Sequence, residues 1–84
     1  MGKKFFPSDF VLIDATRDYD KLKVQYRVGY GKEEWHDGKY RDVYKVQMVY
    51  DGRVSGRQSP SYMHGTEDYE KVHAALTELM KKYG

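Results

Sequence analysis

Two segments of the sequence alternate between apolar and polar side chains. In residues 22–28 and 44–50, Leu, Val, Tyr and Met fall mainly on one parity, and Lys, Gln and Arg fall on the other. Successive side chains of a β-strand point to opposite faces of a sheet, so a period of two predicts strands that are buried on one face only. This pattern restricts the chain to folds in which one side of a sheet is covered and the other side is open.

The C-terminal segment has the period of an α-helix instead. Thr66 is a suitable N-cap, Glu67 and Asp68 follow it in the first turn, and Lys81-Lys82 lies in the last turn, which is the charge order that the helix dipole favours. An apolar stripe recurs at helical spacing and consists of Tyr69, Val72, Leu76, Leu79, Met80 and Tyr83. We therefore predict a helix over residues 66–83 that covers the apolar side of the sheet.

Turn-forming residues divide the rest of the chain. Pro7-Ser8-Asp9 separates an N-terminal tail, residues 1–8, from strand formers in residues 10–16, which we expect to be covered on both faces. The Asp51-Gly52 pair predicts a hairpin. We favour a bulged three-residue connection over a two-residue turn, because the bulged register places Val54 in the core and turns Arg57 away from it.

These elements predict one α+β domain that spans residues 1–84. Its sheet is an antiparallel meander of three to four strands within residues 10–63, and the C-terminal helix packs on one face. The chain has 84 residues and no cysteine, so its core must be stable without disulfides. No segment approaches the roughly 18 apolar residues that span a bilayer, and we expect a soluble, cytoplasmic protein that makes no membrane contact.

The sequence offers no catalytic constellation. Glu33, Glu34, His36 and Asp37 are types that ligate metals, but neighbouring residues of one loop do not converge on an ion without a scaffold. The three histidines are scattered along the chain, and no nucleophile motif is present. We predict that the protein is not an enzyme and that it holds neither a metal nor a cofactor.

The polar parity of the predicted sheet is basic. One face would carry cations without a carboxylate, together with two carboxamides, in the set Lys21, Lys23, Gln25, Arg27, Arg41, Lys45, Gln47, Arg53 and Arg57. Cationic groups contact phosphates, and glutamine reads base edges, so the first functional prediction is a nucleic-acid-binding domain. The alternative is that these side chains only keep an open strand face soluble. The formal net charge of +2 is small, so nucleic-acid binding depends on this segregation of charge.

A polar loop, residues 31–39, carries Trp35 at its centre. An indole in such a loop either folds back over the core or anchors a protein partner. Tyr30 and Tyr40 flank the loop, and the chain has nine tyrosines, more than so small a core buries completely. The second functional prediction is a small interaction or inhibitor protein that binds a protein or a small anionic ligand through these three side chains. The tyrosines and a strand edge near Pro60 are also compatible with a homodimer.

The order of parts between Tyr40 and Tyr83 resembles the arm-binding N-terminal domain of phage and transposon integrases. The resemblance rests on the strand 44–48, the Asp51-Gly52 turn, the basic strand 53–58 and the helix that begins near Thr66. In that family a three-stranded sheet lies in the DNA major groove, so the resemblance implies an origin in a phage or mobile element and DNA contacts by Lys45, Gln47, Arg53 and Arg57. Met63-His64-Gly65 stands where the family usually has a Phe before the Thr. The meander is also similar to single-strand-binding transcriptional coactivators that dimerise through their helices.

Overall fold

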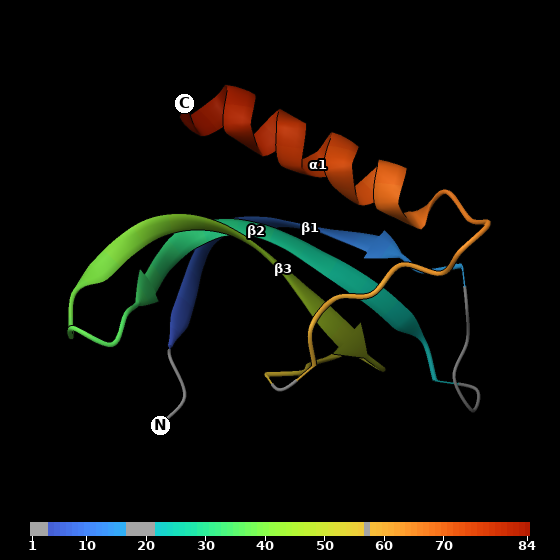
Figure 1. Cartoon of the computed structure of the whole chain (residues 1–84), viewed down its shortest axis with the longest axis horizontal. Coiled ribbons are helices and arrows are strands. Elements are labelled where there is room, and N and C mark those ends of the chain that lie inside the picture. Colours follow the sequence, from blue (N-terminus) through green and yellow to red (C-terminus); the bar gives the residue numbers. More distant parts are fainter. Residues whose placement is uncertain (1–3, 17–21, 57) are drawn as a thin grey trace.

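A computed structural model of the chain describes residues 4–16, 22–56 and 58–84. One antiparallel sheet has the strand order β1-β2-β3-β4 and is followed by a single helix. The elements are β1 (Phe5–Asp14), β2 (Val24–Glu34), β3 (Tyr40–Tyr50), β4 (Arg53–Val54) and α1 (Asp68–Tyr83). The sheet is arched, and α1 lies across its convex side (Figure 1). The predicted α+β meander with a C-terminal helix on one face is confirmed.

The core lies between α1 and the middle of the sheet. Val24, Tyr26 and Val28 of β2 are buried together with Met48 of β3, and α1 contributes Val72 and Leu79. Tyr26 lies directly opposite Met48 in the ladder, so these side chains share one face, as the period of two predicts. Among the described residues, no helix is long and apolar enough to cross a membrane.

The helix packs along a narrower stripe than the sequence indicates. Val72 and Leu79 are buried, whereas Tyr69 is 59% exposed and Met80 is 47% exposed. The predicted apolar stripe is therefore too wide at Tyr69 and Met80, because only one line of the helix faces β2.

The helix begins at Asp68, two residues after the predicted N-cap Thr66, whose hydroxyl donates a hydrogen bond of 2.7 Å to the Met63 carbonyl.

Strand β1 differs from the prediction in two respects. It begins at Phe5, so residues 5–8 belong to the sheet and not to a tail. It is also an edge strand, and Phe10, Val11 and Leu12 are 47%, 41% and 46% exposed, so neither face of β1 is fully covered. The register shifts between Pro7 and Asp9, and this irregularity bends the strand around Gly31 of β2.

Gly31 is required by the close approach of β1 at this bend. A Cβ atom at position 31 would lie 2.2 Å from the Phe6 carbonyl oxygen and 2.6 Å from Pro7 Cα. The sequence pattern predicts a loop that begins at Gly31. Instead, β2 continues to Glu34, and the turn occupies only residues 35–39. The glycine therefore marks contact between strands and not the end of one.

The Asp51-Gly52 hairpin has a two-residue turn, so the prediction of a bulged three-residue connection is wrong. Tyr50 pairs directly with Arg53 and Val49 pairs with Val54, and both turn residues have positive φ, 53° at Asp51 and 83° at Gly52. This geometry matches the twist of the flanking strands better than a bulged connection does. Val54 consequently lies on the side of the sheet away from α1, and Arg53 lies on the side of α1.

Candidate binding face

The side of the sheet opposite α1, which we call the open face, is built from rows of residues that cross the strands. Leu12 of β1 lies opposite Arg27 of β2, which lies opposite Gln47 of β3. The other rows follow from the same registers and run Asp14, Gln25, Val49, Val54; then Phe10, Gly29, Lys45; then Pro7, Gly31, Val43; then Phe5, Glu33, Arg41. The open face therefore combines apolar side chains with charges of both signs.

The predicted cationic residues are only partly brought together. Lys23, Gln25, Arg27, Arg41, Lys45 and Gln47 have the parity of the open face, whereas Arg53 lies opposite Tyr50 and so belongs to the other side. Lys21 and Arg57 lie outside the described residues. The prediction of a single cationic face is corrected at Arg53, because the two-residue turn shifts its parity by one.

The prediction that this face lacks carboxylates is also wrong. Glu33 shares the face because β2 continues past Gly31, and its carboxylate forms an ion pair with the Lys45 ammonium group. The Lys45 side chain is 34% exposed and that of Glu33 is 15% exposed, so water screens this pair less than it screens a surface pair. At the other end of the face, Lys23 Nζ lies 4.0 Å from an oxygen of Asp14.

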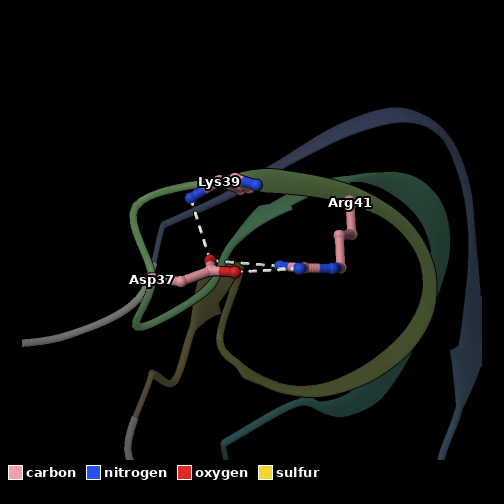
Figure 2. Close-up of polar contacts among 3 residues, drawn as sticks. All are labelled: Asp37, Lys39 and Arg41. Carbon is pink, nitrogen blue, oxygen red and sulfur yellow. Dashed lines mark hydrogen bonds and ion pairs between the residues drawn. The ribbon is translucent and has the colours of Figure 1, made fainter.

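A second ion pair joins Asp37, in the turn that follows β2, to Arg41 of β3. Arg41 donates two hydrogen bonds to Asp37, of 2.8 and 3.1 Å, and the Lys39 backbone N–H donates a third of 3.0 Å (Figure 2). The hydrogen bonds from Arg41 and then from Lys39 lower the pKa of the Asp37 carboxyl to about 2. The guanidinium of Arg41 also lies over the Trp35 ring, 4.6 Å from its centroid. The guanidinium of Arg41 is thereby held between a carboxylate that already neutralises its charge and an aromatic ring.

Arg27 is different from the other cations of the open face. Within the described part of the chain, no carboxylate lies within ion-pair distance of Arg27; its guanidinium donates hydrogen bonds of 2.7 and 3.1 Å to the Gln47 side-chain oxygen. It lies 5.3 Å from the centroid of the Phe10 ring. The centre of the open face is therefore a guanidinium held between a carboxamide and an aromatic ring.

The three aromatic residues predicted to bind a partner do not share one surface. Trp35 is 37% exposed, in the turn beside Arg41. Tyr40 is 50% exposed, and its ring centroid lies 6.2 Å from that of Phe6. Tyr30 has the parity of the core and stacks on Tyr83 of α1, with ring centroids 4.3 Å apart. Only Trp35 and Tyr40 therefore remain accessible at the β2–β3 end of the sheet.

Comparison of the chain with protein-family models, with curated proteins and with solved structures finds no significant match. The resemblance to integrase domains thus stays a prediction.

Sequence reasoning missed the contribution of β1 to the open face. Phe5 and Phe10 lie against Gly29, within 3.6 Å of where its Cβ would be. Phe5 also lines a hollow of about 280 Å³ with Lys45, Gln47, Ser55, Gln58 and Pro60. The parity of Phe10, Leu12 and Asp14 could have indicated this for β1 beyond the bulge, but Phe5 lies before the bulge, where parity counting fails.

No cluster of three or more His, Asp or Glu side chains in the described ranges could hold a metal ion.

Proposed function

We propose that the protein is a non-enzymatic interaction module that binds a protein partner through the open face. The observation that supports this proposal is the centre of that face, where exposed Phe10 and Leu12 adjoin Arg27. Aromatic residues and arginine are enriched where protein interfaces bury most of their binding energy. Most charged side chains around this centre form ion pairs within the chain. Such a surface suits a protein partner that carries both positive and negative groups.

The chemistry of this centre defines the partner surface. Phe10 and Leu12 are 47% and 46% exposed, so they offer apolar area to an aliphatic or aromatic anchor. Arg27 has already bonded one acceptor, Gln47, and its remaining N–H groups suit a carboxylate or backbone carbonyl next to that anchor. We therefore expect a partner that presents an apolar side chain beside an acceptor.

The test is an affinity capture with matched variants. The wild-type chain and a Phe10→Ser/Leu12→Ser variant serve as baits, and Tyr69→Ser/Met80→Ser is the control, because these two helix residues are similarly exposed on the opposite side. We expect the same partner protein to be retained by the wild type and the control and to fall by about tenfold or more with the open-face variant. Equal capture by all three baits, or capture that nuclease treatment abolishes, would reject protein binding through this face.

A second candidate function is nucleic-acid binding, and one observation favours it. Arg27 has no ion-pair partner among the described carboxylates; Gln47 lies opposite it on the same row, and Gln25 lies on the next row. An aromatic ring beside a cation is also the arrangement that stacks unpaired bases. The integrase resemblance belongs to this candidate, although its implied contact Lys45 would have to leave Glu33.

Salt dependence separates the two candidates. Binding of a labelled single strand or duplex should weaken by orders of magnitude between about 50 and 200 mM salt if phosphates supply the affinity. Arg27→Ala should then reduce affinity for all sequences, and Lys32→Ala, on the other parity of β2, should change it much less. Affinity that is unaffected by Arg27→Ala would exclude this face as the nucleic-acid site.

A further inference from the structure

The outer edge of β1 is an unpaired edge within the described part of the chain. Strand β1 pairs with β2 only. The Ala15 N–H donates a hydrogen bond of 2.9 Å to the Val24 carbonyl, and such bonds alternate along an antiparallel pair, so Ile13 and Val11 also face β2. The backbone N–H and C=O groups of Phe10, Leu12 and Asp14 therefore point outward, where another strand can pair with them.

Between Phe10 and Ile13 this edge lacks the features that usually protect an open strand. Lysine, proline and bulges block edge pairing, but Pro7 and the irregularity beside it protect only the beginning of β1. Between Phe10 and Ile13 every side chain is apolar. The exposed fractions of Phe10, Val11 and Leu12 lie between 41% and 47%, so the edge presents apolar area on both faces of the sheet.

A groove between β1 and α1 continues this edge on the convex side. It has a volume of about 590 Å³; Val11, Ala75 and Leu79 contribute its apolar lining, and the charged lining residues are Asp9, Glu78, Lys81 and Lys82. The two acidic and two basic groups balance. A second molecule with the same charges therefore meets no net repulsion at this groove.

We propose that the outer edge of β1 binds a second copy of this chain, with the two β1 strands antiparallel about a twofold axis at Val11. Strands related by such an axis pair residues of equal parity. The axis at Val11 sets Phe10 of each copy opposite Leu12 of the other, and these residues exchange backbone hydrogen bonds through their outward groups. An axis at Leu12 would instead set Phe10 against Asp14, and one at Phe10 would set Leu12 against Ser8, so Val11 gives the best apolar match.

The proposed dimer does not depend on the partner bound by the open face. The two sheets become one continuous sheet, and both copies of Val11 lie together on the convex side between the two helices. Val11 is not a residue of the open face, because it pairs with the core residue Val28. Its substitution therefore tests dimer formation without altering Phe10, Leu12 or Arg27.

A charge-complementation experiment tests both the edge and the register. Val11→Lys and Val11→Glu are made separately, their folding is checked by circular dichroism, and mass is measured by sedimentation with the wild type and with Met80→Lys as a surface control. We expect a dimer for the wild type and the control, at least about tenfold weaker association of each Val11 variant alone, and restored association in their equimolar mixture, because Lys then faces Glu on the axis. A monomeric wild type, or a mixture that stays monomeric, would overturn the proposal.

Hydrogen exchange of the wild-type chain gives an independent measurement that needs no variant. The outward amides of Phe10 and Leu12 should exchange more slowly as protein concentration rises, because dimer formation protects them. Concentration-independent exchange at both amides would contradict pairing at this edge and would leave it available to an extended peptide instead.

Discussion

The Tyr26 hydroxyl donates a hydrogen bond of 3.0 Å to the Asp68 carboxylate beneath the first turn of α1. Asp68 is fully buried, and it also accepts hydrogen bonds from the backbone N–H and the hydroxyl of Thr16, just after β1. One carboxylate thus joins the end of β1, the centre of β2 and the start of the helix. Burial of a charge is tolerated here because donors surround it and the helix dipole favours a negative charge at this position.

This carboxylate predicts an acid-sensitive component of stability. Burial alone raises the pKa of Asp68, but the hydrogen bonds from Thr16 and Tyr26 outweigh it and hold the pKa below its ordinary value of 3.8. The unfolded chain therefore takes up the proton more readily, and the contribution present above about pH 4 is lost as pH falls towards the folded-state pKa. Asp68→Asn should cost about 1–3 kcal/mol at neutral pH.

Urea titrations at neutral pH and near pH 2 check this prediction. The wild type should lose more stability between the two conditions than Asp68→Asn, because the variant has no proton to take up at this site. Tyr26→Phe keeps the buried ring and removes one donor, which brings the folded-state pKa of Asp68 closer to its ordinary value, so the acid-dependent loss of stability should be smaller and complete at a higher pH. Identical pH dependence in the wild type and Asp68→Asn would show that other carboxyl groups determine the acid response.

Glycines 29 and 31 provide a matched pair of substitutions. Gly31→Ala should cost about 2–3 kcal/mol, because its Cβ would overlap the Phe6 carbonyl at 2.2 Å and the backbone of β1 would have to move. At Gly29 the nearest atom to a Cβ is 3.5 Å away, so Gly29→Ala should be neutral or slightly stabilising. Thermal and urea unfolding measure both. Equal effects at the two positions would contradict the close approach of β1 and β2 at Gly31.

Neighbouring helix residues test which side of α1 is packed. Leu79 is 4% exposed, and Leu79→Ala should cost about 2–4 kcal/mol in the free energy of unfolding. Met80 is 47% exposed, and Met80→Ala should cost less than about 0.5 kcal/mol. If Met80→Ala were the more damaging change, Met80 would have to pack against the sheet. The helix would then be rotated from the orientation described here, towards the wider apolar stripe predicted from sequence.

The sequence pattern is sufficient to predict which residues lie on the buried side of the sheet. It is insufficient to predict which residues share the open side. Val24, Tyr26 and Val28 alternate with polar residues because one side of β2 is packed, and this local cause is visible in the order of residues. Gly31 has a distant cause, the backbone of Phe6 and Pro7 lying against it, and a glycine read alone suggests a loop. Glu33 was assigned to that loop for this reason, so its pairing with Lys45 could not be expected.

The length of one turn decided the placement of Arg53 and Val54. A two-residue turn requires positive φ at Asp51 as well as at Gly52. For a residue with a Cβ atom, this backbone conformation costs roughly 1–2 kcal/mol. From sequence, the bulged connection is favoured for another reason: the two-residue turn would direct Arg57 towards the core side, where a charge is costly to bury. The twist of the hairpin, which is a property of both strands together, favours the tighter turn.

The ion pair between Lys45 and Glu33 predicts a loss of stability that an exposed pair does not share. Lys45→Ala leaves the largely buried Glu33 carboxylate without its cation and should cost about 1–2 kcal/mol. Lys32→Ala is the control, because Lys32 and Asp42 form a pair whose side chains are 63% and 55% exposed, and no measurable change is expected. Exchanging the charges by Lys45→Glu with Glu33→Lys should recover much of the loss. Equal stability of Lys45→Ala and the wild type would mean that the pair is fully solvated.

The contacts of Asp9 have a consequence for the order in which the chain folds. Lys82 and Tyr83 each donate a hydrogen bond of 2.8 Å to Asp9 across 73 and 74 positions of sequence, whereas the β2–β3 hairpin closes through a short turn. Short hairpins form within microseconds, but contacts between the two ends of a chain must wait until the intervening segments are ordered. Breaking the Asp9 contacts should therefore leave the folding rate nearly unchanged and accelerate unfolding. We therefore expect the contacts between Asp9 and the end of α1 to contribute to how long the native state persists and not to how fast it forms.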